Sequence, residues 1–214
     1  MENFDNFRLR IQPDYPNILQ QMAVSMQIDK QGAGRAQAMP AGYIARNQQN
    51  NQVVQFRSDG FSFSRLSPYE RWESFRDEGK SLWELYNQLI KPQAIGRAAI
   101  RYINRLELPH NSELKDYFNI FPELRTPMPV GLEGFFVRVQ LAQPEIECVA
   151  LINQSTISTN KSSSVAILLD LDLFRIGNLP KPDQGLWELL EAMHSKQNEL
   201  FESCITNELR KMIA

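Results

Sequence analysis

The 214-residue sequence contains very little cysteine and histidine, with two residues of each. Cys148 and Cys204 lie far apart in the chain, so we expect two reduced, buried thiols in a reducing compartment rather than a disulfide framework. Neither His110 nor His194 has a second histidine within three to five residues, which argues against the usual zinc-binding motifs. The scarcity of both residue types therefore removes disulfide-rich and zinc-stabilised classes of protein.

Long apolar runs and an excess of one charge are also absent. No run approaches the roughly 18 to 20 apolar residues that span a bilayer, and the first residues, MENFDNF, contain no apolar signal core. We therefore expect a cytoplasmic protein with no membrane partner. The formal net charge is only -2, so the chain has no general attraction to nucleic acid, and no nucleic-acid partner is expected.

Residues 58 to 83 contain the most informative local signals. Asp59-Gly60 predicts the turn of a β-hairpin, and the alternation in Phe61 to Ser64 predicts a strand with one packed face. The sequence from Ser67 to Glu70 has the form of a capping box, with proline at the first helical position. Aromatic and aliphatic residues then follow at three- and four-residue steps, which predicts a long amphipathic helix ending at Pro92.

The order of predicted elements along the chain suggests an α+β protein. The expected strands cover residues 5–11, 42–47, 52–57, 60–65, 97–108, 135–142, 145–153 and 164–174, and the expected helices cover 13–27, 68–91, 112–118 and 184–213. Residues 29–41 are expected to form a flexible loop. We expect a single α+β domain over 1–214, with one antiparallel sheet of about seven to eight strands and two long helices packed on one face. The order strand, helix, three strands, helix occurs twice, which also suggests an internal duplication.

Several segments together resemble a known family. They are GFSFSRL at 60–66, Pro68-Tyr69 with Trp72, RYINR at 101–105, LDLD at 169–172, and the closing pattern of Lys196, Asn198, Phe201, Glu202 and Ile205-Thr206. Over about residues 42–213 the chain resembles a sporadically distributed bacterial family that has no assigned function. Members of that family usually begin with an additional strand carrying a Pro-Ile-x-Glu-Ala-like stretch, which has no counterpart here. The resemblance implies no catalytic residue.

Strand alternation places one set of charged residues on a common sheet face. Arg101 and Arg105 share one side of their strand, Arg138 lies opposite the apolar side of the next, and Asp170 and Asp172 lie opposite a leucine-rich side. Arginine forks match phosphate or carboxylate groups, and a pair of carboxylates can bind Mg²⁺. These five residues are the candidate ligand-binding site. The simpler interpretation, which we favour, is that they form cross-strand ion pairs.

Two functions from different classes follow. The preferred one is a non-catalytic binding or interaction module without a cofactor, which binds a protein partner, a second copy of itself, or a small anionic ligand. The alternative is a metal-dependent phosphate- or nucleotide-processing enzyme, in which the arginines bind the anion and Asp170 and Asp172 bind Mg²⁺.

Overall fold

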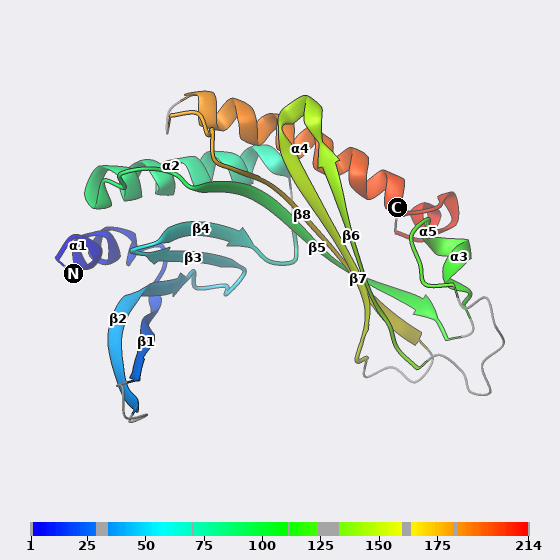
Figure 1. The fold of residues 1–214 in the computed structure, drawn as a ribbon, viewed down its shortest axis with the longest axis horizontal. Helices are drawn as coiled ribbons and strands as arrows, with labels where there is room; N and C mark the ends of the chain where they lie inside the picture. Colours follow the sequence, from blue (N-terminus) through cyan, green and yellow to red (C-terminus); the bar gives the residue numbers. More distant parts are fainter. Residues whose placement is uncertain are drawn as a thin grey trace. The chain divides into compact units, whose positions relative to one another are not determined.

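The computed structural model describes residues 2–28, 34–69, 71–110, 112–123, 133–159, 164–181 and 184–213. Over these residues the protein is α+β, with eight strands in two antiparallel sheets of four strands each (Figure 1). The chain divides into two compact units, Met1–Gln93 and Ala94–Ala214. A single domain over 1–214 stays a prediction. No helix in the described part of the chain is both long and apolar enough to cross a membrane.

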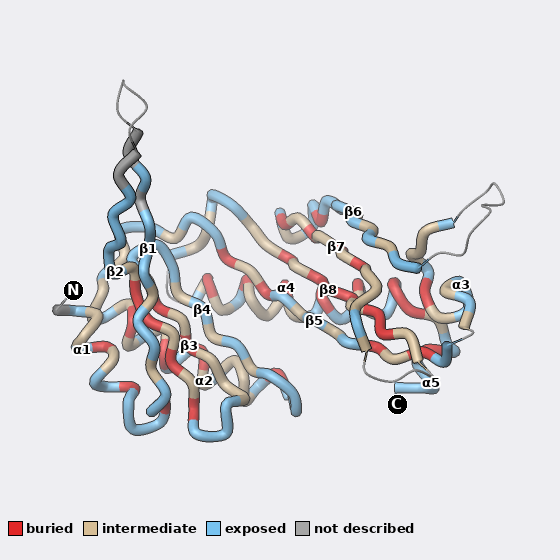
Figure 2. The backbone as a smooth tube through the Cα atoms, turned by 90° about the horizontal axis from the view of Figure 1, so that it is seen from below, coloured by how far each residue is buried: buried red, intermediate tan, exposed pale blue. Residues whose placement is uncertain are grey.

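The first unit contains a four-stranded meander, preceded in the sequence by one helix and followed by another. Its elements are α1 (Glu2–Ile11), β1 (Asn17–Ile28), β2 (Gly34–Arg46), β3 (Gln52–Arg57), β4 (Gly60–Arg65) and α2 (Trp72–Ile90), and the strand order is β1-β2-β3-β4. Strands β1 and β2 pair along their whole length, whereas β3 pairs only with Gly42–Arg46 of β2. The part of β1 and β2 beyond β3 is therefore a two-stranded ribbon, and residues 22–24, 26 and 36–40 in it are exposed (Figure 2).

Aromatic packing forms the core of the first unit. The Phe7 ring of α1 lies 4.4 Å from the Phe56 ring of β3 and 6.0 Å from the Tyr86 ring of α2, measured between centroids. Rings of this size bury a large apolar area and add a modest orientation-dependent attraction. The Tyr86 hydroxyl donates a hydrogen bond to the Arg57 carbonyl, so the helix is attached to the sheet by a polar contact as well. The buried core residues are Phe7, Ile11, Tyr15, Tyr43, Ala45, Val54, Phe56, Leu82 and Tyr86.

The second unit is organised around a long strand pair. Its elements are β5 (Arg97–Pro109), α3 (Leu114–Tyr117), β6 (Phe136–Gln143), the 3-10 helix η1 (Pro144–Ile146), β7 (Cys148–Ile157), β8 (Ser164–Ile176), α4 (Gln184–Cys204) and α5 (Asn207–Ile213). The strand order is β5-β8-β7-β6, and β5 pairs with β8 from Arg97–Ile176 to Pro109–Ser164. Helix α4 contacts β5 and β8.

One face of this second sheet is apolar and buried. Leu169 and Leu171 of β8 and Ile152 of β7 lie in the same cluster as Cys204 at the end of α4. After α4 the chain pairs briefly with the segment that follows α3. Asn119 N–H donates to the Cys204 carbonyl, and Phe118 and Ile205 form an antiparallel bridge. These contacts fix the C-terminal end of the chain against the sheet.

The prediction of one continuous sheet is wrong. Strand β4 pairs with β3, and β5 pairs with β8 along its whole length, so no ladder among the described residues joins the two sheets. Each sheet instead has one long helix against it: α2 contacts β4 in the first unit, and α4 contacts β5 and β8 in the second. The strand orders of the two units differ, and the duplication is not confirmed.

The N-terminal elements are the reverse of those predicted. Residues 5–11 lie in helix α1, because Phe4, Phe7 and Ile11 recur at helical spacing and pack against the core. Residues 13–27 are expected to be helical, but 17–28 form β1, since Ile18, Met22 and other apolar residues also recur with period two. Both segments carry a helical and a strand periodicity in their apolar residues. For residues 17–28, pairing with β2 favours the strand.

Three boundary predictions also need correction. Residues 34–41 of the expected flexible loop belong to β2, and residues 29–33 lie outside the described part of the chain. Helix α2 begins at Trp72 with no side-chain cap at Arg71, so Ser67 does not cap it, and Glu70 lies outside the described residues. The helix expected to run to residue 213 ends at Cys204 and is followed by the separate α5. The hairpin between β3 and β4 is confirmed, but its turn residues are Ser58 and Asp59 instead of Asp59-Gly60, and Gly60 is the first residue of β4.

Gly42 is required where the β1–β2 ribbon leaves the sheet. Its φ is +156°, and an added Cβ would fall well inside van der Waals contact with the Phe56 carbonyl oxygen and the Arg57 backbone. We expect Gly42→Ala to lower the free energy of unfolding by about 2 kcal/mol or more, measured by urea denaturation. Gly60→Ala is the matched control because its Cβ would meet nothing within 4 Å. Equal effects of the two substitutions would contradict this account.

Candidate functional site

The five candidate residues lie on the face of the second sheet that is opposite α4. Strand alternation separates them from the core side chains as predicted: Leu169 and Leu171 are buried in the core cluster, whereas Asp170 and Asp172 lie between them on the other side. On β5, Arg101 and Arg105 alternate with Tyr102, whose hydroxyl lies 2.6 Å from Nδ1 of His194 in α4. We call the surface formed by Arg97, Arg101, Arg105, Arg138, Asn153, Asp170 and Asp172 the Arg/Asp face.

A row of hydrogen bonds crosses this face through all four strands. Arg101 of β5 donates two hydrogen bonds of 2.7 Å to the two carboxylate oxygens of Asp170 in β8. Asn153 of β7 donates to Asp170 at 3.2 Å, and Arg138 of β6 donates to the Asn153 side-chain oxygen at 2.7 Å. The Asp170 carboxylate raises the pKa of the Arg101 guanidinium above its ordinary value, through these hydrogen bonds and its charge. The row therefore fixes one carboxylate between two arginine-bearing edge strands.

The other two candidate residues have different partners. Asp172 accepts hydrogen bonds of 2.8 and 2.9 Å from Arg97, a residue outside the five candidates. The residue directly opposite Asp172 on β5 is Arg101, and the residue opposite Arg97 is Ile176. Both guanidinium groups therefore bind carboxylates that lie diagonally across the strand pair. The Arg97 guanidinium also lies 4.6 Å from the centroid of the Phe174 ring. Within the described part of the chain Arg105 contacts only Glu107, on its own strand, at 3.4 Å.

Charges on the face are layered, with carboxylates beneath and guanidinium groups above. The Asp170 side chain is 7% exposed, whereas the Arg101 side chain bound to it is 55% exposed. The same order holds for Asp172 and Arg97. Large apolar side chains stand among the arginines and are also exposed, namely Ile103, Phe136 and Ile176. The outermost groups of the face are therefore guanidinium donors and exposed apolar side chains.

A metal site is not formed by the two aspartates in this arrangement. Asp170 and Asp172 are each held by a different arginine, and a carboxylate in such a pair is already neutralised. Among the described residues no group of three or more His, Cys, Asp or Glu side chains is placed to hold a metal ion. Sequence analysis missed Asn153, which links the two halves of the row; the alternation of β7 was the signal that could have revealed it.

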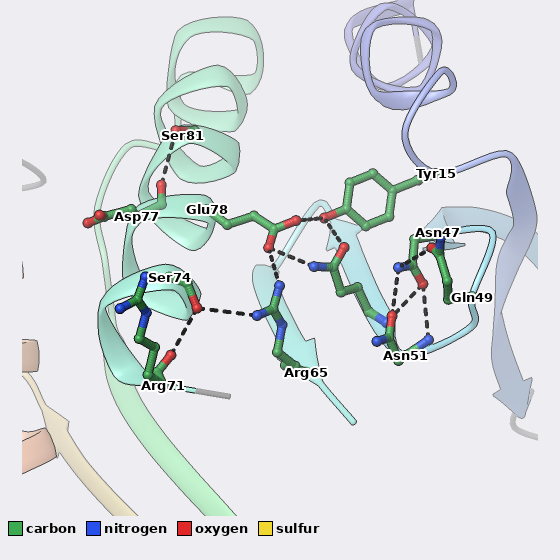
Figure 3. A network of polar contacts seen from close by, with 11 residues as sticks. Tyr15, Asn47, Gln49, Asn51, Arg65, Arg71, Ser74, Asp77, Glu78 and Ser81 are labelled. Atoms are coloured by element: carbon green, nitrogen blue, oxygen red, sulfur yellow. Dashed lines mark hydrogen bonds and ion pairs between the residues drawn. The ribbon is translucent and has the colours of Figure 1, made fainter. Parts of the chain in front are cut away.

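A second polar cluster lies in the first unit around Glu78 (Figure 3). Its carboxylate accepts hydrogen bonds from the Tyr15 hydroxyl at 2.6 Å, from Gln52 at 2.7 Å and from Arg65 at 2.9 Å. Burial, reinforced by the Glu78 hydrogen bond, raises the pKa of the Tyr15 phenol well above its ordinary value. Tyr15 therefore stays protonated at neutral pH, and the cluster joins α2, β3 and β4 as a structural contact.

Both cysteines are buried, and Cys204 lies in apolar surroundings. Cys204 is 1% exposed and lies in the core cluster of the second unit. Burial raises the pKa of its thiol from 9.0 to about 11. Burial also raises the pKa of Cys148, although Arg175 opposes the shift. Because the thiolate is the reactive form, neither residue has the chemistry of a nucleophile at neutral pH.

Comparison with known proteins gives no family for this chain. A scan against protein-family models, a search of curated proteins and a search of solved structures each found no match. The resemblance to a sporadically distributed bacterial family therefore stays a prediction. Any functional inference must come from the geometry of the chain itself.

The layered ion pair predicts an asymmetric response to mutation. Arg101→Ala leaves the buried Asp170 carboxylate without its main partner, and we expect a loss of about 2 kcal/mol in the free energy of unfolding. Asp170→Asn leaves Arg101, which water can solvate, and should cost about 1 kcal/mol. The control Arg105→Ala should change stability by less than about 0.5 kcal/mol. Urea denaturation would contradict this account if Asp170→Asn cost more than Arg101→Ala.

The raised pKa of Cys204 predicts a loss of stability at alkaline pH. Between pH 9 and pH 11 the unfolded thiol releases its proton while the folded thiol keeps it, so stability falls as the pH rises. From pH 8 to pH 10 this contribution is about 1 kcal/mol. Urea denaturation of Cys204→Ala over this range should show a decline smaller by that amount. An identical pH dependence in the two proteins would refute the assignment.

Proposed function

We propose that the protein is a non-catalytic, cytoplasmic binding module whose Arg/Asp face binds a partner protein. The observation that carries the proposal is the layering of this face, with arginine guanidinium groups outermost beside exposed Ile103, Phe136 and Ile176. A surface of this kind offers both apolar contact and directional donors to an incoming chain.

The residue types on the face are those that protein interfaces favour. Arginine and aromatic residues are enriched in the cores of interfaces, whereas lysine is depleted. Four arginines lie on this face, and none of the four strands of the sheet contains a lysine. The guanidinium group of arginine has five N–H donors in one plane and a face that stacks on aromatic rings. An arginine whose guanidinium is already bound to an aspartate can therefore still donate to, or stack on, a partner protein.

Charge indicates the chemistry of the partner. The acidic oxygens of the face are buried or paired, and the exposed groups are guanidinium nitrogens. The partner is therefore a protein surface with carboxylates placed among apolar side chains. A small anionic ligand would satisfy the same donors, and the experiment below distinguishes it.

The alternative of a Mg²⁺-dependent phosphate- or nucleotide-processing enzyme has weaker support. To bind both carboxylates, Mg²⁺ would have to displace Arg97 from Asp172 and Arg101 from Asp170. Mg²⁺ also requires near-octahedral oxygen coordination, and two separately paired carboxylates supply little of it.

The decisive experiment is affinity capture with matched variants of the face. Bacterial cells expressing tagged wild-type protein should yield a specific partner, and binding of the purified partner should weaken at least tenfold in Ile103→Glu/Phe136→Glu, because a carboxylate replaces apolar contact and faces an acidic surface. Arg210→Ala, on α5 and away from the face, is the control and should bind like the wild type. If no captured protein depends on these residues, the proposal fails.

A thermal-shift series separates the small-molecule alternatives. The probes are ATP, GTP, inorganic phosphate and pyrophosphate, each with and without Mg²⁺. We expect no shift in the melting temperature with any of them. A Mg²⁺-dependent shift that disappears in Asp170→Ala/Asp172→Ala would support the enzyme instead, and a metal-independent shift lost in Arg138→Ala would support a small anionic ligand.

A further inference from the structure

The ribbon formed by β1 and β2 beyond the first sheet is a feature that the proposed function does not use. We call residues Met22–Ile28 of β1 and Gly34–Ala41 of β2 the arm. The register of β1 against β2 shifts between Gln21 and Met22, next to the required Gly42, and β3 stops pairing at the same point. The arm runs away from β3 and β4 as two strands alone (Figures 1 and 2). An isolated two-stranded ribbon is marginally stable in water, so this one gains from being covered.

One face of the arm is entirely apolar. Met22, Val24 and Met26 of β1 lie on the same side of the strand as Ile18, which packs against the core. Their exposed fractions are 51%, 69% and 68%. Their partners in register on β2 are Pro40, Ala38 and Ala36. Gln20 separates the three β1 side chains from Ile18 on this side of the strand, and their exposure shows that no described helix of this unit covers them.

The outer edge of β1 lacks the charged and proline residues that protect many edge strands. Natural sheets protect their edges with charged residues, proline, bulges or short strands. The twelve residues of β1, NILQQMAVSMQI, contain no charge, proline or glycine. The arm segment of β2, in contrast, contains Arg35 and Pro40. The unprotected strand is therefore the one that also carries the large apolar side chains.

The chemistry of the arm fits a second copy of the same chain. Apart from Arg35, no residue of the arm carries a charge, so it offers nothing specific to an acidic peptide or to anionic lipid, and two arms brought together meet no like-charge repulsion. On this face the large side chains Met22, Val24 and Met26 lie on β1, and the small ones lie opposite them on β2. In a twofold arrangement the Met22, Val24 and Met26 side chains of each copy lie over the alanines of the other, which is the self-complementarity that a twofold interface needs.

We propose that two copies of the chain associate through their arms and bury the Met22–Val24–Met26 stripe between them. Each copy contributes three large side chains, far fewer than the roughly 20 to 30 residues a side of a standard interface, so we expect a weak dimer with a dissociation constant on the order of micromolar. This association is independent of the Arg/Asp face, which lies on the other unit of the chain. Methionine side chains adapt their shape easily, which suits a contact between two apolar stripes.

Sedimentation equilibrium of the full chain tests the proposal, over concentrations from about 1 to 200 µM. For the wild type the weight-average mass should rise from the monomer value of 24.7 kDa towards twice that value. Val24→Glu/Met26→Glu should stay monomeric over the whole range, because the carboxylates would face each other across the contact. Gln37→Glu adds a charge on the opposite face of the arm and should dimerise within about threefold of the wild type.

A milder pair, Val24→Thr/Met26→Gln, keeps the strand and removes most of the apolar surface. It should weaken the dimer about tenfold while circular dichroism and the melting temperature at low concentration stay unchanged. A wild type that is monomeric at every concentration overturns the proposal. A dimer that survives both stripe variants, or one that Gln37→Glu weakens as much as they do, overturns it equally.

Discussion

The antiparallel pairing of β5 with β8 is the constraint on which the second unit depends. Thirteen residue pairs fix the register from Arg97–Ile176 to Pro109–Ser164. A slip of one residue would move Asp170 and Asp172 into the apolar core and bring Leu169 and Leu171 to the surface. Because the register is correct, the leucines meet α4 and the aspartates meet arginines, and both the core and the Arg/Asp face result from the same ladder.

The first unit is held together differently, by side chains that converge from separate elements. Phe7, Phe56 and Tyr86 come from α1, β3 and α2, and their rings meet in the core. Glu78 adds a polar junction in which every oxygen of the carboxylate has a donor. A partly buried polar cluster of this kind favours one arrangement of the helix on the sheet.

Much of the fold could be predicted where one periodicity dominates the sequence. The alternation in 164–176 could be read in only one way, and it placed Asp170 and Asp172 correctly on a common face with Arg101. The N-terminal 28 residues carry helical and strand periodicities together, and only pairing with β2 decides between them. The sequence also could not predict the partner of each arginine, because Arg97 and Arg101 bind carboxylates that lie diagonally across the strand pair and not directly opposite them.

Strand β8 is the last strand of the second sheet to be synthesised, although it pairs with β5, the first, and this order has a consequence for biosynthesis. Strands of the first unit pair with their sequence neighbours, so that sheet can form as soon as it leaves the ribosome. Strand β5, in contrast, is made long before the strand that pairs with it, and its apolar residues Ile100, Leu106 and Leu108 must wait for β8. During that interval the nascent chain carries an unpaired thirteen-residue strand. Translation speed and chaperone access over residues 110–163 therefore bear on the yield of correctly folded protein.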